Sequence, residues 1–169
     1  VQKVIEEKNP DMPNKEEEAK EIGIGAVVFN NLCTNIIKDQ IFDWDTVLNF
    51  NGETGPYIQY IYVRTNSVIE KAGYVPNIKD VNFELLTDKE SMQVISNLYE
   101  FGDILKVVVD KNEPSILARY LITLSQSYSN FYNENKIISD DNELTKARLY
   151  LTKTVGTVLK TGCELLGMK

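Results

Sequence analysis

The sequence predicts an all-α fold, a bundle of helices around one hydrophobic core. Two long segments carry apolar residues in steps of three and four, the spacing of one face of an α-helix. The first stripe consists of Leu117, Leu121, Leu124, Tyr128 and Phe131. The second consists of Leu144, Ala147, Leu151, Val155, Val158, Gly162 and Leu165. The one β-like run, Val107 to Val109, has no evident partner strand. Helices with such stripes bury them against one another.

Length and composition are those of one globular domain with a packed core. The chain has 169 residues, of which 43% are hydrophobic and 25% charged, and these are ordinary globular values. No apolar run approaches the roughly 18 residues needed to cross a bilayer, so we expect no membrane contact. Cys33 and Cys163 lie among apolar residues and are expected to be buried free thiols. The charged N-terminus shows no signal peptide, and the two thiols favour a reducing cytoplasm. The chain begins at Val1 without Met, and we expect it to be a piece of a longer protein.

The residue types present argue against catalysis within this chain. Histidine is absent, which removes the commonest general base and transition-metal ligand. Two cysteines cannot make a four-ligand zinc site, and Gly23-Ile24-Gly25 lacks the third glycine of a phosphate-binding loop. We therefore expect no metal and no cofactor here. The net charge of −7 argues against nonspecific nucleic-acid binding, but residues 144–169 carry five cations and one carboxylate, which permits a local RNA site.

The N-terminal segment is predicted to hold two helices. Val1 to Lys8 is a short helical candidate that the following prolines terminate. Asn14 is expected to cap the next helix, whose first turn carries three glutamates, the charge that the helix dipole favours there. Gly23 and Gly25 are expected to interrupt this helix before an apolar continuation over 26–35.

Residues 39–55 are predicted to be a loop with one helical turn near Thr46–Asn49. Trp44 has apolar neighbours and is expected to anchor this loop onto the bundle, with stacking on RNA as the alternative. Asp43 and Asp45 are interpreted as helix caps, because no third ligand for a metal lies nearby.

Pro56 is expected to start a helix that runs to Ala72 and ends at Gly73. Its residues separate onto two faces. The first face contains Ile58, Ile61, Thr65, Val68 and Ala72. The second contains Tyr57, Tyr60, Arg64, Ser67 and Lys71. Aromatic rings stack on unpaired bases and cations neutralise phosphates, so we interpret the second face as an RNA contact. On periodicity alone, the commoner explanation of such a stripe is packing against another helix.

The second half of the chain continues with three helices. Residues 74–82 are a linker, and the capping-box pattern Thr87–Glu90 starts the first of the three. Asn112-Glu113-Pro114 starts the second. Asp140 or Asp141 is expected to cap the third.

Several motifs form an ordered series along the chain. The longest is Gly52-Glu53-Thr54-Gly55-Pro56-Tyr57-Ile58-Gln59-Tyr60. Phe42-Asp43-Trp44-Asp45 precedes it, and Ala118-Arg119-Tyr120-Leu121 and Leu165-Leu166-Gly167-Met168 follow it. Together they resemble the C-terminal, anticodon-binding end of arginyl-tRNA synthetases. Ala118-Arg119-Tyr120-Leu121 resembles the DALR-type motif of that family, although Ile116-Leu117 replaces its Asp-Ala start.

The resemblance implies a helix bundle of the class I aminoacyl-tRNA synthetase anticodon-binding type. It implies that 1–50 is a helical connector from a catalytic domain of the same chain and that 51–169 is the anticodon-binding bundle. The parent enzyme joins arginine to tRNA using ATP and Mg²⁺. The two motifs that carry this chemistry in the family do not occur here, so this part is expected to bind the tRNA(Arg) anticodon stem-loop and not to catalyse.

The resemblance also implies which residues meet the RNA. The two tyrosines of the family's Pro-Tyr-x-Gln-Tyr motif face the anticodon loop, and here they are Tyr57 and Tyr60. A further aromatic comes from the DALR-type helix, and its match is Tyr132 or, less closely, Tyr128. For Arg148, a solvated helix face is as good an explanation as a phosphate contact. The predicted tRNA-binding residues are Tyr57, Tyr60, Arg64, Lys71, Tyr128, Tyr132 and Arg148.

Two other functions fit part of the sequence. The acidic net charge and the apolar stripes also suit a helical protein–protein interaction module with no RNA role. A related bundle of another synthetase, such as the cysteinyl or glycyl enzyme, is a further alternative, against which the Gly-x-Thr-x-Pro-Tyr-x-Gln-Tyr run counts.

Overall fold

The computed structural model of the chain describes residues 1, 14–35, 37–39 and 42–168. Its α-helices are α2 (Lys15–Cys33), α3 (Trp44–Val47), α4 (Gly55–Ala72), α5 (Lys89–Lys111), α6 (Pro114–Glu134) and α7 (Asn142–Leu165). Two 3₁₀ turns, η1 (Ile78–Asp80) and η2 (Phe83–Leu85), connect α4 to α5. No strand occurs in this described part, and Val107 to Val109 lies inside α5, so the all-α prediction is confirmed. The helix predicted for Val1 to Lys8 lies, apart from its first residue, outside the described residues.

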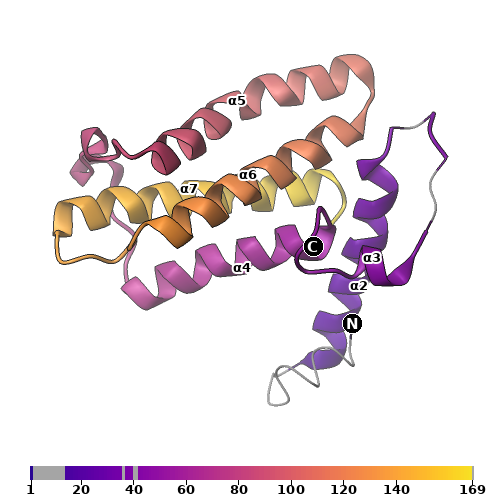
Figure 1. The fold of residues 1–169 in the computed structure, drawn as a ribbon, viewed down its shortest axis with the longest axis horizontal. Helices are drawn as coiled ribbons and strands as arrows, with labels where there is room; N and C mark the ends of the chain where they lie inside the picture. The colour runs from indigo at the N-terminus through magenta and orange to yellow at the C-terminus, as the bar shows by residue number, and fades with distance from the viewer. Residues whose placement is uncertain (2–13, 36, 40–41, 169) are drawn as a thin grey trace.

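Four long helices form an elongated bundle, and α2 crosses one end of it (Figure 1). The central helix is α6, which packs against α2, α4, α5 and α7. Its predicted stripe is confirmed, because all five apolar residues are buried, with Tyr128 and Phe131 among the largest fully buried side chains. Burial of this size, about 1.5–3 kcal/mol for each large apolar side chain, makes α6 the element around which the other helices are arranged.

The predicted stripe of α7 is right in its middle and wrong at its end. Ala147, Leu151, Val155 and Gly162 are buried, but Leu165 is exposed. Because α7 packs against both α4 and α6, its buried surface is wider than one stripe. A Cβ atom at Gly162 would collide with the side chain of Leu121 on α6, so the two helices approach each other as closely as glycine allows.

The N-terminal helix differs from the prediction at two points. α2 runs without a break through Gly23 and Gly25. A Cβ atom on Gly25 would lie 2.9 Å from Gln59 Nε2 of α4, so this glycine serves a close contact between helices. Burial of Ala26 and Phe29 beside it outweighs the roughly 1 kcal/mol that a glycine costs inside a helix. Asn14 does not cap α2 with its side chain, because its backbone is left-handed, with φ of 57°, and its side chain accepts no capping hydrogen bond.

The segment around α3 is anchored by a residue other than the one predicted. Trp44 is exposed and packs edge-on against exposed Phe42, with ring centroids 4.7 Å apart. Val47 is the buried residue of this helix, and it lines a small cavity together with Ala26 and Phe29 of α2. Asp43 caps the helix as predicted, since it accepts a hydrogen bond from the Thr46 amide at 2.9 Å.

The helix ends follow the predicted chemistry closely. Thr54 caps α4 by accepting from the Tyr57 amide at 3.2 Å, and Gly73 closes it with φ of 74°. Asp88, and not Thr87, caps α5 by accepting from the Ser91 amide at 2.8 Å. Asp141 caps α7. No helix in the described ranges has the length and apolar character needed to cross a bilayer.

Candidate RNA-binding site

The first three turns of α4 place two tyrosines on the surface. The two predicted faces of this helix are confirmed: Ile58 and Ile61 are fully buried, and Tyr60 on the opposite side is 45% exposed. Tyr57 is half-buried. Because the Thr54 cap and Pro56 fix where the helix begins, they also fix the direction in which both tyrosines leave it.

Arg64 joins these tyrosines to a third one on α6. Its guanidinium carbon lies 4.6 Å from the ring centroid of Tyr60 and 4.8 Å from that of Tyr132. Both distances are within the roughly 6 Å over which a cation is attracted to an aromatic face. Nη2 of Arg64 also donates to the Tyr60 hydroxyl, and Nη1 donates to Ser129 Oγ at 3.4 Å. The guanidinium therefore donates to two protein hydroxyls and holds two rings from different helices.

We name the five residues that meet here the tyrosine cluster: Tyr57, Tyr60, Arg64, Ser129 and Tyr132. Tyr132 is 39% exposed, so each outer ring keeps a surface open to solvent. Burial raises the pKa of Tyr57, although a hydrogen bond with Ser129 and the charge of Arg64 both act to lower it. The phenol is therefore uncharged at neutral pH, and the cluster carries the single positive charge of Arg64.

Tyr128 is not part of this surface, and its predicted RNA contact is wrong. Its side chain is completely buried, and burial raises the pKa of its hydroxyl to about 12. The ring lies under the cluster, with its centroid 6.4 Å from that of Tyr132. Since α6 turns this residue toward the core and Tyr132 toward α4, Tyr128 supports the exposed ring from inside and offers no face to a base.

Residues 58–169 match the DALR anticodon binding domain. The chain belongs to this family. Arginine–tRNA ligases of Halothermothrix orenii and Alkaliphilus metalliredigens are 46% and 44% identical to it over 169 residues, which is 100% of this chain and 30% of each relative. The chain thus spans less than a third of the length of these curated relatives. The resemblance found in the sequence motifs is confirmed.

Solved structures give the same result for the fold of this DALR domain. The arginyl-tRNA synthetase of Thermus thermophilus superimposes with a TM-score of 0.90 at 32% identity, over 99% of this chain and 29% of that one. The enzyme from Plasmodium falciparum gives 0.81 at 28% identity, over 93% and 28%. The predicted bundle type is therefore confirmed.

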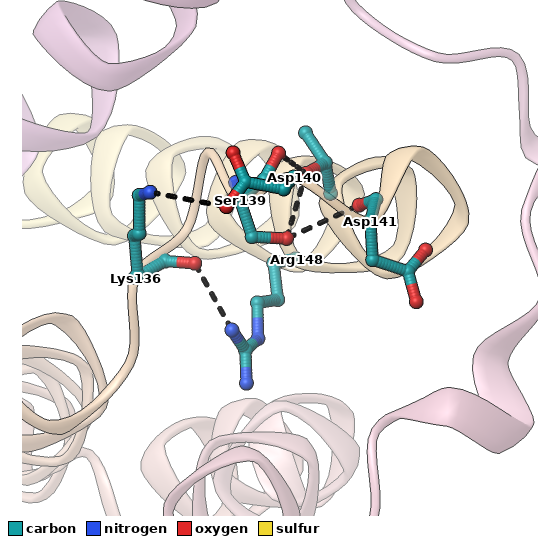
Figure 2. A network of polar contacts seen from close by, with 6 residues as sticks. Lys136, Ser139, Asp140, Asp141 and Arg148 are labelled. Carbon is teal, nitrogen blue, oxygen red and sulfur yellow. Dashed lines mark hydrogen bonds and ion pairs between the residues drawn. The ribbon is translucent and has the colours of Figure 1, made fainter.

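Arg148 of the DALR domain is occupied by protein contacts, and the structure supports neither of its two predicted roles. Its side chain is 13% exposed. Figure 2 shows the guanidinium under the loop between α6 and α7, where Nη1 donates to the Lys136 carbonyl at 3.0 Å. Nη2 donates to Asn135 Oδ1 at 2.7 Å and lies 3.9 Å from Asp88 Oδ2. Arg148 therefore ties the start of α7 to the end of α6 and to the cap of α5.

The contacts around Asp88 lower the pKa of its carboxyl. Burial acts to raise the pKa of its carboxyl, but hydrogen bonds from the Ser91 amide and hydroxyl, together with the charge of Arg148, lower the pKa below its ordinary value. The same loop carries an ion pair between Lys136 and Asp140 at 3.8 Å (Figure 2). This end of the DALR domain is held by polar contacts as well as by the core.

Lys71 lies apart from the tyrosine cluster. It is exposed near the end of α4, seven residues beyond Arg64, which is about 10 Å along a helix axis. Its contact with RNA stays a prediction.

Ser129 is the member of the cluster that the sequence did not indicate. Its hydroxyl accepts from Arg64 across 65 residues of sequence. Serine recurs at positions 125, 127 and 129 of α6, and no local pattern distinguishes the one that faces α4. No group of three or more residues suited to metal binding occurs in the described part of the chain.

Proposed function

We propose that this chain is the anticodon-recognition domain of an arginine–tRNA ligase and that its tyrosine cluster binds unpaired bases of the tRNA(Arg) anticodon loop. The observation that carries the proposal is the pair of exposed rings, Tyr60 and Tyr132, held on either side of Arg64 by two different helices. The names of the relatives and the family of the domain support the choice of tRNA.

The chemistry of the cluster suits single-stranded RNA. Bases in a loop are unstacked and can lie flat on a phenol ring, and each such base contributes about 1–3 kcal/mol. Because Arg64 already fixes two of the rings, binding does not have to order them, and the entropy cost of association falls. Tyr57 adds an uncharged phenol next to these rings, which can exchange hydrogen bonds with a base edge.

The attachment of arginine to tRNA belongs, in this proposal, to the rest of the protein. The chain spans 30% of the length of its curated relatives, and we infer that a catalytic domain of the same polypeptide uses ATP and Mg²⁺ to join arginine to the tRNA in the cytoplasm. The segment 1–50 is then the connector to that domain, and the bundle of 51–169 holds the anticodon while the other end of the tRNA is charged.

The proposal is tested by removing one ring at a time. Tyr60→Ala and Tyr132→Ala are each titrated with a labelled anticodon stem-loop of tRNA(Arg), and we expect a loss of affinity of about five- to 150-fold, the factor that one stacked base contributes. Tyr99→Ala is the matched control, because Tyr99 is a tyrosine on α5 that is 86% exposed and lies outside the cluster. It is expected to bind like the wild type.

Thermal unfolding of all three variants shows whether the fold is kept. If Tyr60→Ala and Tyr132→Ala fold normally and bind the stem-loop as tightly as Tyr99→Ala does, the cluster is not the binding site. A stem-loop with the anticodon of another amino acid provides the second comparison, and equal affinity for it contradicts the choice of tRNA(Arg).

A further inference from the structure

The helix α6 carries almost no charge, although it belongs to an acidic protein. Among its 21 residues the charged ones are Arg119 and Glu134, whereas α5 has seven charged residues in 23. The first half of α4 is also uncharged before Arg64. Although the protein is acidic as a whole, α6 and the first half of α4 therefore form a nearly neutral surface, and the tyrosine cluster lies on it.

The solvent-facing side of α6 is a row of polar side chains: one guanidinium, one hydroxyl and three amides. We name this row the α6 outer face: Arg119, Thr123, Gln126, Asn130 and Asn133. These positions follow one another in steps of four and three, as one side of a helix requires, and all five are exposed. The row covers 14 residue steps, or about 21 Å of helix.

The amides of this row are available to a ligand. The Thr123 hydroxyl donates to the Arg119 carbonyl at 3.1 Å. In contrast, Gln126, Asn130 and Asn133 make no hydrogen bond with any other described residue through their side chains. Each amide offers two donors and an acceptor, so these three residues present uncharged donors that can bind phosphate and ribose oxygens.

The α6 outer face begins beside the tyrosine cluster, about 100° around the helix from it. Asn130 follows Ser129 directly, and Asn133 follows Tyr132. Grooves run along both sides of the row, one between α6 and α2 beside Gln126 and one between α6 and α5 beside Asn130. Cations stand at both ends, Arg119 in the first groove and Lys89 in the second. Carboxylates line the grooves too, Glu53 the first and Glu90 and Glu134 the second.

We propose that the α6 outer face binds the ribose-phosphate backbone of the RNA strand whose bases stack on Tyr60 and Tyr132. This inference rests on the proposed function of the cluster. Most contacts between proteins and nucleic acids go to phosphate and sugar, and they set the position of the strand without reading its sequence. Amides serve this purpose here because their donors reach phosphate oxygens and the 2′-hydroxyl, which both donates and accepts.

A change of one atom in a side chain tests the proposal. Gln126→Glu and Asn130→Asp keep the size of the side chain and add one negative charge. We expect each to weaken binding of tRNA(Arg) about fivefold at low salt, the factor given by two like charges about 4 Å apart in water. The control is Asn66→Asp, an exposed residue of α4 that lines a groove with Lys153 of α7 and not with α6.

Adding a positive charge at the same positions should increase affinity, a result that an unfolded variant cannot produce. Gln126→Lys and Asn130→Lys are expected to tighten binding by a similar factor. Each is also expected to steepen the dependence of log K on log salt by about 0.7, the value for one more phosphate neutralised on a single strand.

The two proposals fail in different ways in this titration. If the acidic variants match Asn66→Asp and the lysine variants leave the salt dependence unchanged, while Tyr60→Ala still weakens binding, the α6 outer face is not a backbone site and the tyrosine cluster stands. If Tyr60→Ala also binds like the wild type, the proposed function itself is wrong.

Discussion

Arg64 of α4 lies 4.8 Å from the ring centre of Tyr132 on α6, so the candidate site is built across two helices. The two residues are far apart in sequence, and each leaves the surface of a different helix. Arg64 also contacts Tyr60 one turn earlier on α4. This arrangement changes what we expect of the arginine: it holds the rings in place and does not extend toward a phosphate.

The salt dependence of binding tests this role of Arg64. We predict that Arg64→Met weakens stem-loop binding about tenfold, because two cation–π contacts of about 0.5–1 kcal/mol each are lost. The slope of log K against log salt should stay the same. A slope that falls by about 0.7 in Arg64→Met indicates that the guanidinium neutralises a phosphate after all.

Arg148 is predicted to act on stability and not on RNA binding. Arg148→Met removes two hydrogen bonds from a charged donor and one ion pair. We expect the free energy of unfolding to fall by about 2 kcal/mol, the scale of hydrogen bonds to charged groups. Urea unfolding measures this loss. Stem-loop affinity, measured well below the melting temperature, should change less than twofold, and a tenfold loss of affinity in a folded protein contradicts this assignment.

The pH dependence of stability should contain a contribution from Asp88. Its pKa is lower in the folded chain than in the unfolded one, so the carboxylate stabilises the fold above the unfolded value of about 4. This contribution is lost as the pH falls from there through the folded-state pKa. We predict that Asp88→Asn is less stable than the wild type at pH 7 and that the difference shrinks below about pH 4. Urea titrations across this range test the prediction, and a difference that does not change with pH contradicts it.

Replacement by alanine should lower the stability of the fold at one helical glycine and raise it at another. Gly162→Ala places a methyl group against Leu121 in the core, and overpacking of this kind costs about 1–3 kcal/mol. Gly102→Ala on α5 meets nothing within 4 Å and should stabilise the helix by about 1 kcal/mol. Thermal unfolding of the two variants gives the comparison. If Gly162→Ala melts at or above the wild-type temperature, the packing of α7 against α6 is looser than described.

The faces of α4 could be predicted from sequence because one helix has one period. Ile58 and Tyr60 differ by two positions, and a period of 3.6 must place them on different sides. The ends of the helices could also be predicted, because Pro56, Gly73 and Asp141 act on the backbone directly beside them.

The errors have a common physical origin, which is the packing of one helix against another. Two predictions for Tyr128 conflicted: the apolar stripe of α6 placed it in the core, which is confirmed, and the resemblance offered it as a base contact, which is wrong. Tyr132 lies outside that stripe and is open beside α4. Arg148 belongs to the same class, because its partners Asn135 and Asp88 come from other elements. Trp44 failed for the complementary reason: the size of a ring predicts burial, but here the smaller Val47 is buried and lines a small cavity together with residues of α2.

The most direct test of the account separates the ring of Tyr132 from its hydroxyl. Tyr132→Phe keeps the aromatic face, and Tyr132→Ala removes it, so stem-loop titration of both variants shows whether stacking contributes to the affinity. If the ring stacks on an anticodon base, Tyr132→Phe binds within about twofold of the wild type and Tyr132→Ala loses about fivefold or more. If both variants bind like the wild type, or both lose affinity equally, the ring of Tyr132 does not stack on an anticodon base.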